Sequence, residues 1–104
     1  MEQKKYKIKY TDSFINDIIE ITQYITYDLS NPIVADNLID NIDDSIINRL
    51  QYPIGFRKYS SKNNPKETYY KIHVKNFTIF YVVIEDVMEC RRIIYNRRDL
   101  ENII

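Results

Sequence analysis

The chain is poor in the residues on which several kinds of site depend. Among its 104 residues there are one cysteine (Cys90), one glycine and one histidine. A single cysteine cannot form an internal disulfide and is typical of a reducing compartment. One glycine excludes a glycine-rich phosphate loop, and no Cys/His spacing suits zinc. We therefore expect no metal site and no cofactor, and we expect Cys90, in a strand-like run, to be a buried, inert thiol.

Long apolar runs are also absent. None approaches the roughly 20 residues needed to cross a bilayer, and the N-terminal MEQKKYKIKY has no apolar h-region of a signal peptide. We therefore expect a cytoplasmic protein without a membrane partner. The apolar content of 44%, with 13% aromatic residues, excludes a disordered chain. The length of 104 residues predicts a single domain, residues 1–104.

An excess of charge of one sign is missing overall but not locally. The formal net charge is zero, which is not typical of a nucleic-acid-binding protein. Residues 1–52 carry five Lys and Arg and nine Asp and Glu, a charge of −4, whereas residues 53–104 carry ten and six, a charge of +4. The basic half permits a local phosphate-binding face, and a solvated mixture of charges is the alternative.

The stretch from Tyr69 to Tyr95 is rich in Tyr, Phe, Val and Ile and contains no Pro or Gly, which predicts consecutive β-strands. Alternation in the first strand places Tyr70, Ile72 and Val74 on a core face and Tyr69, Lys71, His73 and Lys75 on the other. The sequence therefore predicts a sheet with one covered face and one partly cationic open face.

The register of the next strand depends on a two-residue turn at Lys75-Asn76. Asn at the second turn position tolerates a positive φ, whereas Lys at the first does not favour one. This turn predicts three cross-strand pairs, namely Val74 with Phe77, His73 with Thr78, and Lys71 with Phe80.

The first half of the chain predicts a strand and two helices. Residues 6–10 alternate as in a strand, and Thr11-Asp12-Ser13 can cap a helix over about residues 13–27. Asn31 and Pro32 then suit the start of a second helix, and the short connection predicts an αα-hairpin. The expected fold class is α+β, with the hairpin packed on one face of an antiparallel sheet in the order β-α-α-β-β-β, with room for one more strand. The residues expected in the core are Ile18, Ile21, Ile25, Leu38, Ile42, Ile46, Ile72, Val74, Ile79 and Tyr81.

Several short motifs follow one another along nearly the whole chain. They are Asp17-Ile18, Tyr24-Ile25, Asn31-Pro32, Leu50, Pro53, Tyr70-Lys71, Asn76-Phe77, Ile79-Phe80-Tyr81 and the ending Arg92-Ile93-Ile94-Tyr95-Asn96-Arg97-Arg98-Asp99. As an ordered set they resemble the RelE/ParE superfamily of bacterial type II toxins. The resemblance implies an α+β toxin that is neutralised by a cognate antitoxin encoded beside it. RelE-like members cut messenger RNA in the ribosomal A site, whereas ParE-like members poison DNA gyrase.

The resemblance also implies site residues. RelE-like members carry a basic pair on one strand, where Lys71 matches the first member and His73 replaces the second. Their arginine near the C-terminus matches Arg97. Another arginine and a terminal tyrosine would fall at Thr78 and near Ile103, and both are missing here. Such departures are expected of a ParE-like chain.

Cleavage of RNA by its own 2′-OH needs a base, an acid and cations around the phosphate. We expect His73 to move the proton, Lys71 to hold the scissile phosphate and Arg97 to stabilise the developing charge, without a metal. The further candidates for binding RNA or phosphate are Lys75, Arg98, Tyr69 and Phe80, with the two rings as stacking platforms. The alternative is a surface histidine between solubilising lysines.

We therefore predict the toxin of a type II toxin–antitoxin system, RelE-like, that cuts messenger RNA on the ribosome and arrests translation. Its partners would be the antitoxin, the ribosome and messenger RNA. Two alternatives remain open. One is a ParE-like, non-enzymatic gyrase inhibitor, and the other is a degenerate toxin that retains only antitoxin binding.

Overall fold

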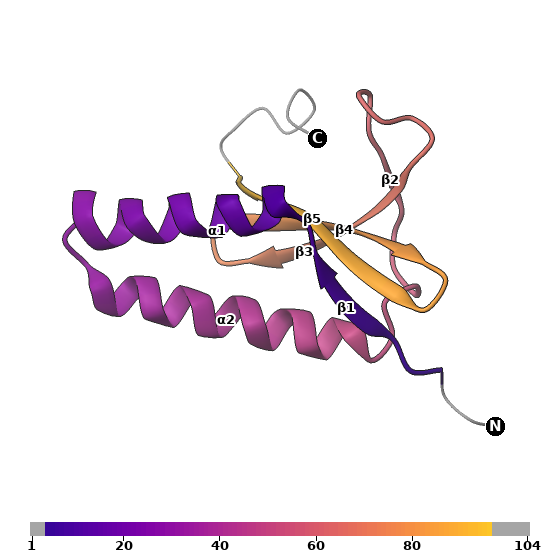
Figure 1. Cartoon of the computed structure of the whole chain (residues 1–104), viewed down its shortest axis with the longest axis horizontal. Helices are drawn as coiled ribbons and strands as arrows, with labels where there is room; N and C mark the ends of the chain where they lie inside the picture. The colour runs from indigo at the N-terminus through magenta and orange to yellow at the C-terminus, as the bar shows by residue number, and fades with distance from the viewer. Residues whose placement is uncertain (1–3, 97–104) are drawn as a thin grey trace.

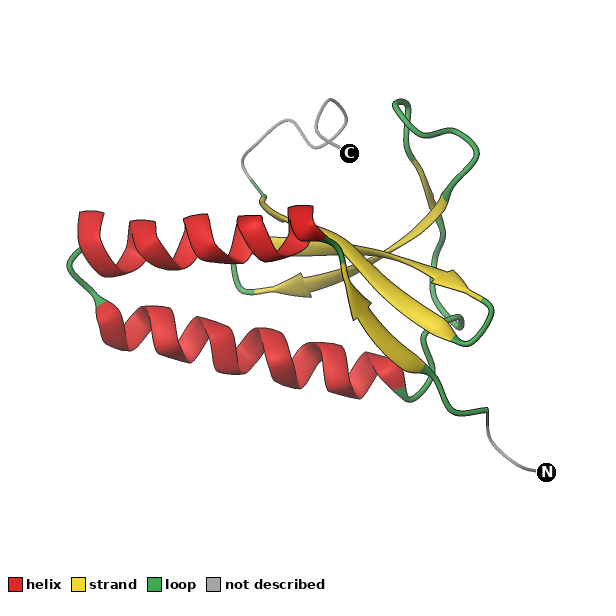
Figure 2. Cartoon of the chain, viewed as in Figure 1, coloured by secondary structure: helices red, strands yellow, loops and turns green. Residues whose placement is uncertain are grey.

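A helical hairpin packs on one face of a five-stranded sheet (Figure 1 and Figure 2). The computed structural model describes residues 4–96. Its elements, in chain order, are β1 (Lys7–Tyr10), α1 (Asp12–Gln23), the π-helical turn η1 (Tyr24–Asp28), α2 (Pro32–Leu50), β2 (Tyr59–Ser60), β3 (Thr68–Val74), β4 (Phe77–Ile84) and β5 (Val87–Tyr95). The predicted α+β class and the αα-hairpin are confirmed.

Both helices begin at the predicted caps. The side chains of Thr11 and Asn31 each accept a hydrogen bond from a backbone amide in the first turn, at 3.2 and 3.3 Å. Pro32 occupies the first position of α2, where its missing N–H costs nothing. The first helix was expected to end near Tyr27, and helical structure does reach Asp28, but its last turn is the π-helical η1.

The strand order across the sheet is β1-β5-β4-β3-β2. Strands β2, β3, β4 and β5 pair antiparallel, as expected for strands linked by short connections. Strand β1 instead pairs parallel with β5, from Lys7 opposite Val87 to Tyr10 opposite Cys90. The sheet is therefore mixed, whereas an antiparallel sheet was predicted. No local turn joins the first strand to the last, so no sequence pattern sets their relative direction.

The β3–β4 turn lies at Lys75-Asn76, as predicted. It gives the predicted pairs, which are Val74 with Phe77, His73 with Thr78, and Lys71 with Phe80. The positive φ of the turn, 55°, falls on Lys75 and not on the asparagine that tolerates it better. The turn therefore stores some backbone strain at an exposed lysine.

The core lies between the hairpin and one face of the sheet. Of the residues predicted to be buried, Ile25, Leu38, Ile42, Ile46, Ile72, Val74, Ile79 and Tyr81 are buried. Ile18 and Ile21 are partly buried and pack against the same cluster. The apolar faces expected from helical and strand periodicity thus meet. Within residues 4–96, no helix combines the length and the apolar character needed to cross a membrane.

Candidate functional site

The face of the sheet that points away from the helices, called the open face below, carries most residues predicted to act on RNA. Because side chains alternate along β3, Tyr69, Lys71 and His73 share this face. Their partners Thr78 and Phe80 on β4 lie on it too. His73 is exposed and Lys71 is half-buried. Strand geometry therefore brings together two of the three predicted catalytic residues.

A small apolar cluster fills the middle of the open face. Tyr69, Phe80, Val82 and Ile94 are buried there, and Tyr59 of β2 packs on them. Tyr69 and Phe80 are only 2% and 0% exposed, and their rings meet edge to face with centroids 6.5 Å apart. Both rings are covered, so neither offers a face to an unstacked base in the way expected from the sequence.

Lys71 is engaged with the same cluster. Its Nζ lies 3.9 Å from the centroid of the Tyr59 ring and 5.8 Å from that of Phe80. A cation over an aromatic face gains about 0.5–2 kcal/mol, which a phosphate would have to replace to draw the ammonium away. The carbonyl of Lys71 accepts a hydrogen bond from Arg49 Nη1 at 3.1 Å, which fastens this part of β3 to α2.

His73 is tied to two other side chains. Its Nδ1 lies 3.1 Å from Thr78 Oγ1, and the Thr78 hydroxyl donates to Asn96 Oδ1 over 2.5 Å. Thr78 is fully buried, so its hydroxyl needs partners within the protein. The turn register predicts that His73 faces Thr78. Asn96 was missed, because it arrives from beyond β5 and no local spacing connects it to His73.

The other predicted site residues do not join this group in the described part of the chain. Lys75 belongs to the turn and not to β3, and it lines the groove described next. Its positive φ ends the strand alternation from which its place on the open face was inferred. Arg97 and Arg98 lie outside the described residues, so their roles remain predictions.

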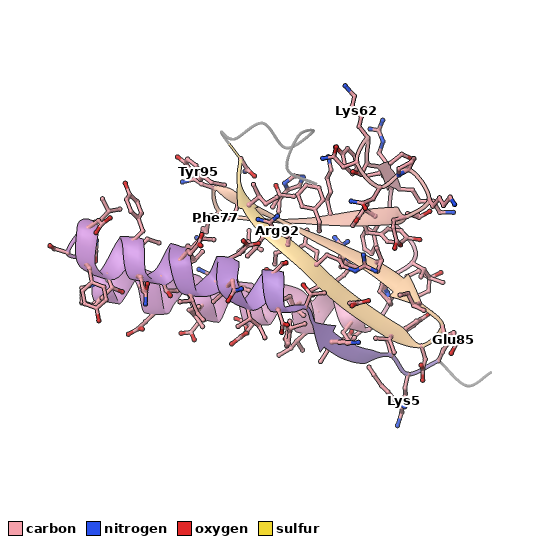
Figure 3. All side chains as sticks on the ribbon, turned by 45° about the horizontal axis from the view of Figure 1, so that its top comes forward. Lys5, Lys62, Phe77, Glu85, Arg92 and Tyr95 are labelled. Carbon is pink, nitrogen blue, oxygen red and sulfur yellow. The ribbon has the colours of Figure 1, made fainter. Side chains whose placement is uncertain are left out.

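A groove of about 790 Å³ lies between the two helices, the β3–β4 turn and the end of β5. Its apolar lining includes Ile21, Tyr24, Leu29, Val34, Phe77 and Tyr95, and its polar lining includes Asp17, Glu20, Lys75 and Arg92. Phe77 and Tyr95 lie at the end of the sheet beside the hairpin, Arg92 lies farther along β5, and Glu85 marks the other end (Figure 3). Tyr24, Leu29 and Val34 are exposed, so the groove opens at the hairpin tip onto an apolar surface.

Asp17 joins α1 to the wall of this groove. Its carboxylate accepts hydrogen bonds from Arg92 Nε at 2.7 Å, from Arg92 Nη2 at 3.0 Å and from the amide of Ile93 at 3.1 Å. The bond to Asp17 raises the pKa of the Arg92 guanidinium. Beyond the end of β1, α1 thus supplies the acceptor that a neighbouring strand would otherwise give to the edge of β5.

Cys90 is buried, and burial raises its pKa to about 12. Its thiol therefore stays protonated at neutral pH and is not a nucleophile. In the described part of the chain, no group of three or more His, Cys, Asp or Glu side chains is arranged to hold a metal ion.

Three comparisons relate this geometry to known proteins. Residues 8–100 match the family described as the ParE toxin of the type II toxin–antitoxin system, parDE. A chain of the chromosomal ParDE TA system from P. aeruginosa is similar, with a TM-score of 0.67 and 16% identity over 88% of this chain and 96% of that one. YafQ from E. coli strain BL21(DE3) has a TM-score of 0.50 and 18% identity over 86% and 92% of the two chains. At such identities the structures share the fold alone. No curated protein sequence matches the chain.

Proposed function

Because the chain belongs to the ParE toxins of type II toxin–antitoxin systems, we propose that it arrests bacterial growth by binding DNA gyrase and not by cutting RNA. The observation that carries this proposal is the ParE match over residues 8–100, a range that includes all three candidate cleavage residues. Thr78, in place of a RelE-like arginine, fits the same branch. Gyrase acts in the cytoplasm, where we place the protein.

The geometry of the open face supports a binding role. Phosphate cleavage without a metal needs cations aimed at the developing charge. At the position of the missing arginine, Thr78 is buried and bonded to His73 and Asn96. The Lys71 ammonium lies over the ring of Tyr59. An ammonium held over a ring in this way suits contact with a protein surface better than it suits phosphate chemistry.

We propose further that a segment of the cognate antitoxin occupies the groove between the hairpin and the sheet. The exposed apolar side chains of Tyr24, Leu29 and Val34 form one continuous surface with the buried lining. An amphipathic helix that lays its apolar face in the groove would remove these side chains from water.

The antitoxin site is tested with two variants of α2. Val34→Asp puts a charge into the groove, whereas Ile47→Asp makes a similar change at an exposed residue that does not line it. Calorimetry should show antitoxin binding at least about tenfold weaker for Val34→Asp, since a buried unpaired charge is costly. Ile47→Asp should bind as the wild type does. Equal binding by both variants would place the antitoxin elsewhere.

A ribonuclease is the second candidate function, and one observation favours it. His73 is exposed on the same face as Lys71, and within residues 4–96 its Nε2 has no hydrogen-bond partner. His73 would then take the 2′-OH proton, Lys71 would hold the phosphate and Arg97 would stabilise the charge. On this mechanism His73→Ala lowers cleavage by about 10²–10⁴-fold.

Two assays on the purified protein separate these functions. We expect inhibition of gyrase supercoiling by the wild type, relief by the antitoxin, and no cleavage of ribosome-programmed messenger RNA. Cleavage that is lost in His73→Ala would replace the gyrase proposal with the ribonuclease. Equal cleavage by both proteins would establish a ribonuclease that does not use His73. Neither effect, with antitoxin binding intact, would identify a degenerate toxin.

A further inference from the structure

A buried threonine links the single histidine of the chain to the end of β5. His73 and Thr78 are cross-strand partners, with Nδ1 and Oγ1 3.1 Å apart. Thr78 Oγ1 lies 2.5 Å from Asn96 Oδ1. Asn96 is itself fixed, because its backbone amide donates to the carbonyl of Asn76 over 2.9 Å. Side chains from β3, from β4 and from the residue that follows β5 thus form one row of hydrogen bonds.

The proton count gives this row a direction. A threonine hydroxyl has one proton to donate and can also accept. The 2.5 Å separation between Thr78 and Asn96 suits an O–H···O bond and is shorter than the usual N–H···O range of about 2.7–3.2 Å. Asn96 therefore presents its carbonyl oxygen and takes the Thr78 proton. The Thr78 oxygen is left to accept from His73, so Nδ1 must carry a proton.

We infer that Thr78 and Asn96 are positioning residues: when the His73 ring is in its neutral form, they hold its proton on Nδ1 and present the Nε2 lone pair on the open face. His73 is exposed there, and within the described residues no partner occupies Nε2. The bond made by one ring nitrogen decides the state of the other. In the neutral form of the ring, the site therefore takes a hydroxyl or amide donor from the macromolecule that covers this face. The opposite tautomer would suit an acceptor such as phosphate.

The tautomer is a property of the isolated chain, so the inference is tested apart from the proposed function. Ring ¹⁵N chemical shifts show which nitrogen is protonated, and the single histidine gives one set of signals. At a pH of about 9, where an imidazole is neutral, the wild type should be protonated at Nδ1. Thr78→Val removes the hydroxyl that accepts from Nδ1. Asn96→Ala removes the acceptor of the Thr78 hydroxyl proton, so that this proton can be donated to Nδ1 instead. Both should shift the majority to Nε2–H, the form that free histidine prefers.

Two control variants make the result specific. Asn96→Asp keeps only acceptors at this position and should retain Nδ1–H. Thr22→Val makes the same chemical change on α1, where the hydroxyl donates to the carbonyl of Ile18, and should leave the ring unchanged. A wild-type ring protonated at Nε2, or an Nδ1–H ring that persists in Thr78→Val, would overturn the inference. Unfolding midpoints by circular dichroism establish that each variant is folded.

A second measurement tests whether the lone pair is presented. Diethyl pyrocarbonate reacts with a free ring nitrogen, and mass spectrometry of peptides locates the reaction at His73. The wild type and Asn96→Asp should react severalfold faster than Thr78→Val, in which the free nitrogen is Nδ1 and faces β4. Equal rates in all three proteins would refute the presentation of Nε2, even with the inferred tautomer.

Discussion

Removal of the Asp17 carboxylate should destabilise the fold far more than removal of an exposed charge. The carboxylate accepts three hydrogen bonds from β5, two from Arg92 and one from the amide of Ile93. Asp17→Ala breaks all three at once. The amide of Ile93 then lies under α1 without its acceptor, and the guanidinium of Arg92 loses its carboxylate.

The magnitude follows from the burial of the pair. An unsatisfied buried amide costs about 1–3 kcal/mol. Breaking a buried ion pair costs about 3–5 kcal/mol, and losing an exposed one costs about 0–1 kcal/mol. The side chains of Asp17 and Arg92 are 13% and 30% exposed, so this pair lies between the two limits. We expect Asp17→Ala to lower the free energy of unfolding by about 3 kcal/mol. Asp17→Asn keeps an acceptor for Ile93 and should cost about half as much.

Urea unfolding followed by circular dichroism measures these changes as shifts in the midpoint at constant slope. Asp36→Ala, at an exposed position of α2, is the control and should stay within about 0.5 kcal/mol of the wild type. Arg92→Met completes a double-mutant cycle, in which the coupling energy with Asp17 should exceed about 1 kcal/mol. If Asp17→Ala costs no more than Asp36→Ala, α1 is not fastened to β5 through this carboxylate.

Three further predictions test the core, the buried thiol and the tautomer. Ile42 is 3% exposed, so Ile42→Ala should lower the free energy of unfolding by about 2–5 kcal/mol in the same urea experiment, and a loss below about 1 kcal/mol would contradict the packing described. Burial raises the pKa of the Cys90 thiol from 9.0 to about 12. The protonated thiol therefore contributes its full share of the free energy of unfolding below a pH of about 9. That share, up to about 4 kcal/mol, is lost as the pH rises toward 12. Urea midpoints should fall less steeply over this range in Cys90→Ala, and an identical fall would be evidence against the raised pKa. In cells, Thr78→Val should arrest growth less than Thr22→Val, because a His73 ring protonated at Nε2 cannot accept a hydrogen bond from a donor on the target. Equal arrest by the two variants would place His73 outside the target contact.

The fold could be predicted because its signals are local. Helical spacing alone marks Ile42 as core, and strand alternation marks Ile72. The caps at Thr11 and Asn31 set the helix starts. The parallel pairing of β1 with β5 could not be predicted, because it joins the two ends of the chain and depends on how the whole hairpin packs.

The candidate site was less accessible to such reasoning, because alternation shows which face a side chain points to and not what covers it. It correctly placed Lys71 and His73 together. It could not show that Tyr59, from a two-residue strand, would pack over Phe80 and meet the Lys71 ammonium. The hydrogen bond from Thr78 to Asn96 could not be predicted either, because its two partners are 18 residues apart in the sequence and no local spacing connects them.

The groove and the open face adjoin at the β3–β4 turn and at the end of β5, where Ile94 belongs to both. Asn76 lines the groove, and its carbonyl also holds the amide of Asn96. Asn96 in turn accepts the Thr78 proton, which in the inferred tautomer leaves the Thr78 oxygen to accept from Nδ1 of His73. A segment in the groove would thus contact Asn76, the residue that anchors this row. Under the proposed function, an antitoxin segment seated there is one backbone hydrogen bond away from the row that holds His73.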